Sequence, residues 1–217
     1  MKYFEARGPA LVGCATVVTF LVVASQSARA GAPTEQLREH VDQVIKMLQR
    51  PELQGDGKTT ERRTAVRKIA NNIFDFQETA KRSLGRHWQA RTPAERDEFT
   101  QLFSDLLEHA YIGKIDRYSG ENVNYVGESV EGDQATVRTK ILTKQGSEVP
   151  VDYRLLREGA QWRVYDVVIE GVSLISNYRT QFNKIITTSS FQELMKKMKT
   201  KQDEFIGEEK PKRTSLR

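Results

Sequence analysis

The sequence is nearly devoid of cysteine, since Cys14 is the only one among its 217 residues. Cys14 lies within residues 1–30, which have the features of a removable secretory leader, so we expect the mature chain to contain no cysteine. This absence excludes a disulfide, a thiol nucleophile and a Cys-containing metal site from the mature protein. Its folded state must therefore depend on a hydrophobic core, which a single domain of this length can build.

Long hydrophobic runs are also absent, with one exception near the start. Residues 11–24 form an apolar run that is short for a membrane span, with basic residues before it and a small-x-small sequence at residues 28–30 after it. This pattern predicts a signal peptide that is cleaved after Ala30. A lipid on Cys14 and an uncleaved anchor are both disfavoured, because the run continues well past Cys14 and is followed by a good cleavage site.

No charge of one sign dominates the chain. It has 34 Lys and Arg against 29 Asp and Glu, a formal net charge of +5, and the two signs are mixed along most of its length. The exceptions are a basic cluster at residues 62–68 and the basic tail after residue 209. We interpret both as solvated surface, the alternative being contact with anionic lipid head groups or an acidic partner. The mild excess argues against a nucleic-acid partner.

Catalytic and metal-binding motifs are missing as well. No two of His40, His87 and His109 lie at ligand spacing on one helix, and no HExxH, GxSxG, P-loop or GxGxxG pattern occurs. The sequence therefore predicts that the protein is not an enzyme and holds no metal or cofactor.

Two pairs of carboxylates are the remaining candidates for acid–base chemistry. Asp75 and Glu78 lie one helical turn apart, and we interpret them as a helix cap and a solvated side chain. Asp166 and Glu170 lie at the end of a predicted covered strand, where a carboxylate needs a partner, and Arg179 is a candidate. We interpret this pair as structural. The alternative is an enzyme with an acid in the pocket of a cone-shaped α+β fold.

Helical periodicity dominates the first half of the mature chain and returns at its end. Asp75 is a predicted N-cap, Gly85 a predicted stop, and Thr92 with Glu95 a predicted capping box at the start of the longest helix. The predicted helices cover residues 33–53, 60–73, 75–84, 94–118, 173–187 and 191–201. Residues 31–201 are predicted to form a single domain, and residues 202–217 a flexible basic tail.

Between these helical regions, apolar residues recur at every second position, with Gly-containing turns between the runs. On the last run, residues 162–169, Val164 and Val168 are expected on one face and Tyr165, Val167 and Ile169 on the other, so both faces are expected to be covered. The pattern predicts an α+β fold with a four-stranded antiparallel meander sheet. Helices 94–118 and 173–187 are its expected covers, and together they enclose an apolar cavity.

Several segments resemble one known family in order and spacing. Residues 165–182, YDVVIEGVSLISNYRTQF, are similar to the C-terminal signature of the periplasmic toluene-tolerance family, whose best-known members are MlaC-type phospholipid-binding proteins that serve an ABC transporter. Residues 73–88 resemble its fDf…A…LG…W element, residues 92–111 its tp.qr.eF…lF..lL…Y helix, and residues 149–155 its pv.Yrl strand. The resemblance spans residues 35 to 200.

This resemblance implies a soluble periplasmic carrier, most simply a monomer, that holds phospholipid acyl chains. It implies a shuttle between an outer-membrane lipoprotein complex and an inner-membrane ABC transporter complex with an MCE-domain protein, which maintains outer-membrane lipid asymmetry. Related members occur in hopanoid gene clusters, so a hopanoid or other polycyclic lipid is an open alternative. Two different classes of function stay open beside the carrier, namely an enzyme and an interaction module with a vestigial cavity.

We expect the cavity to be lined from the inner faces of the sheet and its covering helices, although ordinary core packing is the alternative for each residue. The predicted lining consists of Phe74, Phe76, Leu84, Trp88, Phe103, Leu107, Tyr111, Val151, Tyr153, Val167, Ile169, Val172, Ile175 and Tyr178. Arg82, Arg86 and Arg154 are candidates for contact with a head-group phosphate, or else solvated arginines.

Overall fold

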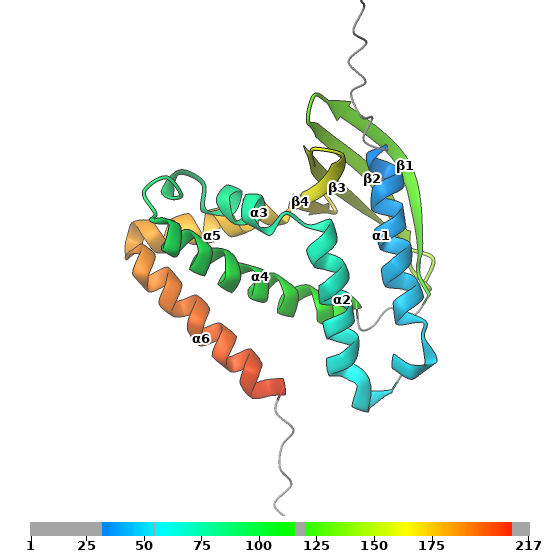
Figure 1. Cartoon of the computed structure of the whole chain (residues 1–217), viewed down its shortest axis with the longest axis horizontal. Coiled ribbons are helices and arrows are strands. Elements are labelled where there is room, and N and C mark those ends of the chain that lie inside the picture. Colours follow the sequence, from blue (N-terminus) through cyan, green and yellow to red (C-terminus); the bar gives the residue numbers. More distant parts are fainter. Residues whose placement is uncertain (1–31, 54, 116–119, 210–217) are drawn as a thin grey trace, which may run out of the picture.

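The structure is a computed structural model that describes residues 32–53, 55–115 and 120–209. The predicted signal peptide, its cleavage site and residues 210–217 lie outside the described residues. Figure 1 shows a curved sheet with the first helices of the chain near it, and the later helices grouped beside it. In chain order the elements are α1 (Pro33–Leu48), α2 (Thr59–Ile73), α3 (Phe76–Leu84), α4 (Pro93–Ile115), β1 (Asn122–Glu131), β2 (Gln134–Leu142), β3 (Glu148–Glu158), β4 (Gln161–Ile169), β5 (Val172–Ser173), α5 (Leu174–Thr188) and α6 (Phe191–Glu209).

Local sequence signals place most helix starts. The Asp75 carboxylate accepts a hydrogen bond from the Glu78 amide at 2.8 Å, which confirms the predicted N-cap of α3. The Thr92 amide donates to the Glu95 carboxylate at 2.9 Å, and the Glu95 amide donates to the Thr92 hydroxyl at 3.2 Å. These reciprocal bonds confirm the capping box of α4. Gly85 ends α3 with a φ of 57°, a conformation that favours glycine.

Two predicted helix ends are wrong. The first helix ends at Leu48 rather than residue 53, and a separate 3₁₀ turn follows at Pro51–Leu53. The last helix continues to Glu209 instead of ending near residue 201. Its final turns are held by tertiary contacts, because the Phe205 ring stacks on His109 of α4 with 3.4 Å between ring centres.

The sheet is an antiparallel meander in the order β1-β2-β3-β4-β5, so the α+β fold is confirmed with one strand more than predicted. The added strand, β5, follows a tight turn in which Glu170 and Gly171 have φ values of 50° and 81°. Positive φ at both central residues is typical of the hairpin turn that matches the twist of a sheet. The chain therefore pairs back on β4 before α5 begins.

A bulge in β4 overturns the predicted alternation of that strand. Arg154 of β3 pairs with Asp166, but the next residue, Leu155, pairs with Val164, which leaves Tyr165 as an extra residue. Because one extra residue reverses the side-chain alternation, Val164 and Val167 lie on the same face of the sheet. We call this the inner face.

Two hydrophobic clusters make up most of the core. The helical cluster lies among the last four helices and consists of Ala80, Leu84, Trp88, Phe99, Leu102, Phe103, Ile175, Phe182, Phe191, Leu194, Met195 and Met198. The sheet cluster lies between the inner face and the first two helices and consists of Leu37, Ile73, Ala135, Val137, Leu155, Trp162 and Val164.

The cover of the inner face differs from the prediction. The helical residues that cover the inner face in the sheet cluster belong to α1 and α2, not to α4. Helix α4 packs against α3 and α6 instead, and α5 contacts β4 at the side of the sheet. Helical periodicity identifies the apolar stripe of α4 but not its partner, and the aromatic rings of α5 and α6 are that partner.

Candidate functional site

The structure divides the predicted lining residues between the two clusters. Those in or against the helical cluster are Leu84, Trp88, Phe103, Leu107, Ile175 and Tyr178. Those against the sheet cluster are Phe74, Tyr153 and Val167. The others are Phe76, whose ring stacks on Phe74, Tyr111 near Tyr178, Val151 and Ile169 on the inner face, and Val172, which is 58% exposed on β5. The predicted lining is thus not a single surface.

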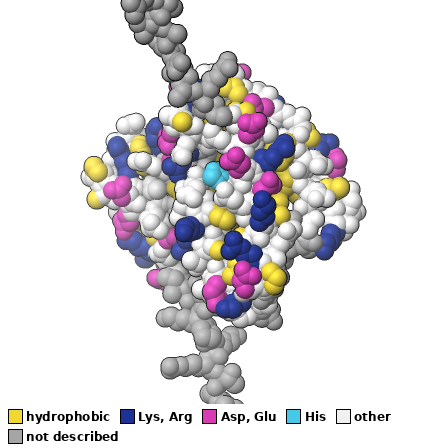
Figure 2. Space-filling model, turned by 45° about the vertical axis from the view of Figure 1, so that its right-hand side comes forward, with side chains coloured by type: hydrophobic (Ala, Val, Ile, Leu, Met, Phe, Trp, Pro, Cys, Tyr) yellow, Lys and Arg dark blue, Asp and Glu magenta, His cyan; other side chains and the backbone are white. Residues whose placement is uncertain are grey.

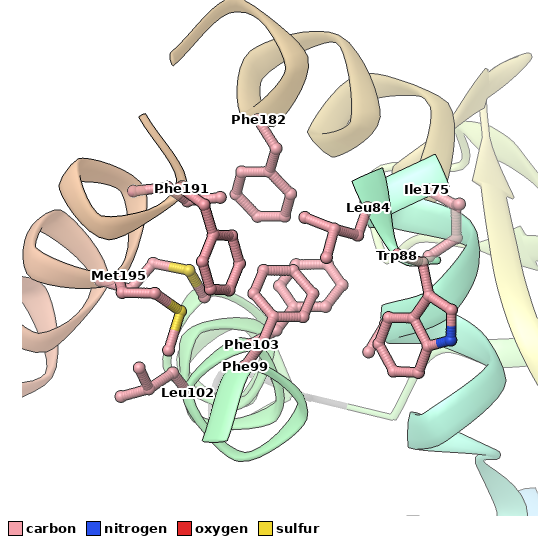
Figure 3. Packing of buried hydrophobic residues seen from close by; sticks show 12 residues of the cluster. Leu84, Trp88, Phe99, Leu102, Phe103, Ile175, Phe182, Phe191 and Met195 are labelled. Atoms are coloured by element: carbon pink, nitrogen blue, oxygen red, sulfur yellow. The ribbon is translucent and has the colours of Figure 1, made fainter. Parts of the chain in front are cut away.

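The helical part of the set is closely packed. Figure 3 shows Phe99, Phe103 and Phe182 with their rings against one another between the helices. The Phe103 ring centre lies 5.8 Å from that of Phe99 and 5.2 Å from that of Phe182, and its side chain is 1% exposed. Such a residue is surrounded by protein atoms and acts as core in this structure. Ligand contact by Leu84, Trp88, Phe103 or Ile175 stays a prediction.

The inner face of the sheet is filled less completely. Two rows of paired residues cross it, one through Tyr125, Thr139, Val151 and Ile169, the other through Val137, Tyr153 and Val167. We call Tyr125, Thr139, Val151, Tyr153, Val167 and Ile169 the inner strip. Tyr125, Tyr153, Val167 and Ile169 are only half-buried.

The inner strip is apolar despite its threonine. Thr139 is 1% exposed, and its hydroxyl donates a hydrogen bond to the Val151 carbonyl at 2.7 Å. A hydroxyl that is satisfied by the backbone leaves its methyl group to face the neighbouring side chains. The strip therefore offers hydrocarbon surface that α1 and α2 do not cover in full, as a lipid tail requires.

Tyr125 is a residue of this site that the sequence-based list omits. Its ring lies under α1, where the Arg38 guanidinium is 4.5 Å from the ring centre. Its hydroxyl is buried and has no hydrogen-bond partner among the described residues. The sequence holds one signal that could have found it, since Tyr125 alternates with Val123 on a strand and so points to the same face as Val123.

The pKa values of four tyrosines near these surfaces are all raised. Burial raises the pKa of Tyr153 to about 12, and burial likewise raises the pKa of Tyr111. Burial raises the pKa of Tyr178, and the nearby Tyr111 adds to that effect. Burial also raises the pKa of Tyr125, with a further contribution from Tyr153. All four phenols therefore remain neutral hydrogen-bond donors at physiological pH.

Two of the predicted head-group arginines have partners on the helices. Arg82 donates from Nε to the Glu78 carboxylate at 2.7 Å, and its guanidinium lies 4.0 Å from the centre of the Tyr165 ring. Arg86 donates to the Asn183 side-chain oxygen at 3.0 Å. A phosphate would have to compete with these contacts, and head-group binding by either arginine stays a prediction.

The third predicted arginine belongs to the surroundings of Asp166. Arg154 donates to Asp166 Oδ2 at 3.1 Å, and the same oxygen accepts from the Ser173 hydroxyl at 2.7 Å. The other carboxylate oxygen accepts from the Ile175 amide at 3.1 Å. Asp166, which is 4% exposed, thus ties β4 to the start of α5.

The predicted partner of Asp166 is therefore wrong. Arg179 does not pair with this carboxylate but donates to the Arg82 backbone carbonyl at 2.7 Å. Arg154 is harder to identify from sequence because it becomes a neighbour only through strand pairing. A carboxylate whose two oxygens are occupied by three protein donors is suited to a structural role rather than to acid–base chemistry.

A polar groove of about 480 Å³ lies where α3, the start of α4 and the end of β3 meet. Its charged lining residues are Asp75, Glu78, Lys81, Arg96, Asp97 and Glu158. Partial burial raises the pKa of Glu158, and the hydrogen bond and negative charge of Asp75 raise it further. This charged lining is unsuited to hydrocarbon chains.

Two further site types find no support in the part of the chain that the structure describes. Its His, Cys, Asp and Glu side chains form no group that could hold a metal ion. None of its helices is long and apolar enough to cross a membrane. Figure 2 shows basic and acidic side chains interspersed on one face of the molecule, with apolar side chains in small groups between them.

Comparison with known proteins yields one consistent result. The family model described as MlaC protein matches residues 38–200. The intermembrane phospholipid transport system binding protein MlaC of Haemophilus influenzae is 22% identical over 192 residues, which cover 84% of this chain and 90% of that protein. The toluene tolerance protein ttg2D of Pseudomonas putida is 23% identical over 120 residues, 54% of this chain and 56% of that protein.

A solved structure has the same fold. It is the phospholipid-binding protein of Ralstonia solanacearum in complex with a phospholipid, with a TM-score of 0.72 and 24% sequence identity. The match covers 80% of this chain and 98% of that one.

Proposed function

The chain belongs to the MlaC protein family, and we propose that it is a phospholipid-binding transport protein rather than an enzyme. The observation that carries this proposal is the family match over residues 38–200. It is supported by the relative in Haemophilus influenzae, whose name is that of a phospholipid transport binding protein, and by the phospholipid-bound structure with the same fold.

The inner strip gives this function a physical basis. Exposing a lipid tail to water costs about 0.8 kcal/mol of free energy per CH₂. A carrier must therefore bury most of a sixteen-carbon tail, whose full exposure would cost on the order of 12 kcal/mol. Half-buried residues such as Tyr153, Val167 and Ile169 can supply apolar contact without catalytic groups. We place the acyl chains against the inner strip, with the remaining predicted lining residues as candidates for further contacts.

The transport route is a finer part of the proposal. A cleaved signal peptide would deliver the protein to the periplasm, where it would shuttle phospholipid between an outer-membrane lipoprotein complex and an inner-membrane ABC transporter complex of the MCE type. This exchange would maintain the lipid asymmetry of the outer membrane. A monomeric carrier with mixed surface charges suits such repeated, reversible encounters.

Mass spectrometry of the lipid extracted from the protein tests this function directly. The mature chain would be purified from the periplasm without detergent, and its organic extract compared with that of an unrelated periplasmic protein prepared in parallel. Near-stoichiometric phospholipid is the expected result. A hopanoid would retain the carrier mechanism with another cargo, whereas a protein that is lipid-free and refuses added phospholipid would refute the proposal.

A further inference from the structure

The buried hydroxyl of Tyr125 is the polar group in the inner strip that the described part of the protein leaves unsatisfied. Buried hydroxyl groups in folded proteins nearly always have a hydrogen-bond partner, and leaving one without a partner costs free energy. The hydroxyl of Thr139, the residue paired with Tyr125, is engaged with the Val151 carbonyl instead. The Tyr125 hydroxyl is therefore left able to donate to an acceptor from outside the chain.

Tyr153 lies close to Tyr125 on the same face. Tyr125 of β1 pairs with Thr139, and Tyr153 of β3 pairs with Val137, so the two tyrosines flank the small residues of β2. Tyr153 accordingly contributes, after burial, to the raised pKa of Tyr125. The small β2 side chains between them leave the space over the strip to the two rings.

The chemistry of this pair selects the kind of acceptor. Burial raises the pKa of Tyr125 and of Tyr153, so both are uncharged donors at physiological pH. A phosphate is a poor match, because an anion buried beside neutral phenols would lack a full counter-charge. The Arg38 guanidinium stacked on the Tyr125 ring is opposed by the negative charge of Asp42, which acts on the Tyr125 hydroxyl in the opposite direction. A neutral carbonyl oxygen in an apolar setting is the acceptor that suits a phenol.

We infer that the Tyr125 hydroxyl, assisted by Tyr153, donates a hydrogen bond to an ester carbonyl of the bound lipid and makes the site selective for acyl-ester lipids over lipids that lack this carbonyl. This inference rests on the proposed phospholipid binding and deepens it. It places the glycerol-ester region of the lipid at the β1–β3 part of the inner strip, with the hydrocarbon chains continuing over Val167 and Ile169.

A comparison of ester-linked and ether-linked phosphatidylglycerol with identical alkyl lengths tests the inference. Affinities would be measured by displacement of a fluorescent phospholipid from the delipidated mature protein. We expect the wild type to bind the ester form roughly five- to tenfold more tightly, the factor typical of one buried hydrogen bond. Tyr125→Phe should abolish this preference by weakening ester binding alone, and Tyr153→Phe should reduce it.

Tyr165→Phe is the matched control, because Tyr165 is the bulge residue whose ring stacks with Arg82 outside the inner strip. It should keep the wild-type preference. Thermal unfolding without lipid gives a second readout, in which Tyr125→Phe should be at least as stable as the wild type because it removes an unsatisfied hydroxyl.

Three results would overturn the inference. The first is an equal affinity of the wild type for the two lipids. The second is an ester preference that survives Tyr125→Phe, with the proposed function left intact. Failure of the wild type to bind either lipid would refute the proposed function itself, so the two failures are distinguishable.

Discussion

The helical cluster and the inner strip are both apolar, but they are filled to different degrees. Phe99 and Phe103 of the helical cluster are 0% and 1% exposed, with rings from two other helices around them. Tyr125, Tyr153 and Val167 of the inner strip are only half-buried. Large rings from several helices can fill a core completely, whereas a curved sheet with small residues at its centre leaves surface for another molecule.

Their polar groups differ in the same way. The hydroxyls of Thr79 and Ser83 in α3, which borders the helical cluster, donate to backbone carbonyls at 2.7 Å and 2.8 Å. The Tyr125 hydroxyl on the inner strip has no such partner among the described residues. The hydroxyls of α3 are thus satisfied by the protein itself, whereas the inner strip combines uncovered apolar surface with an unpaired hydroxyl, as a binding site does.

Truncation of Phe103 should give the largest effect on stability. Phe103→Ala removes a ring that contacts Phe99, Tyr178 and Phe182, and we expect the free energy of unfolding to fall by about 3–5 kcal/mol. Urea unfolding of the lipid-free protein measures this loss. Val126→Ala, at a 56% exposed position on β1, should change the stability by no more than about 0.5 kcal/mol. A similar small loss for Phe103→Ala would contradict the assignment of the helical cluster as the main stabilising core.

The helical region is the easier of the two to predict from sequence, because its signals are local. The N-cap at Asp75 and the capping box at Thr92 and Glu95 depend on neighbouring residues and are confirmed. The end of α6 is not predictable in this way, since the stacking of Phe205 on His109 joins helices that are distant in sequence. Local rules locate where a helix begins more reliably than what it packs against.

The sheet region shows the limits of periodicity. Alternation predicts the strands, but the extra residue at Tyr165 reverses the faces of the residues after it, and nothing in the local pattern marks the bulge. The same limit applies to the prediction of the candidate site. Val167 and Tyr153 are among the predicted lining residues, whereas strand alternation could place Tyr125 on a face but could not show that its hydroxyl is buried without a partner.

Filling the inner strip should separate binding from stability. Val167→Trp adds a large side chain next to Tyr153 on a surface that is half-buried, so we expect phospholipid occupancy to drop several-fold while the free energy of unfolding changes by only about 1–2 kcal/mol. Lipid content per protein, measured by mass spectrometry, and urea unfolding give the two values. Val126→Trp, at an exposed position, is the control and should keep wild-type occupancy. Undiminished lipid in Val167→Trp would place the cavity elsewhere.

The smallest expected effect on stability is that of a substitution in the polar groove, where α3 and the start of α4 meet the end of β3. The raised pKa of Glu158, above its usual value near 4.5, means that the folded state holds this proton more tightly than the unfolded state. Stability from this group is therefore present below pH 4.5 and is lost as the pH rises through the folded pKa.

Glu158→Gln removes the repulsion from Asp75, so the variant should gain stability relative to the wild type at pH 7 but not at pH 4. Urea unfolding at the two pH values measures the difference, which should be modest because Glu158 is exposed and partly screened. An equal effect at both pH values would show that Asp75 and Glu158 do not couple across the groove.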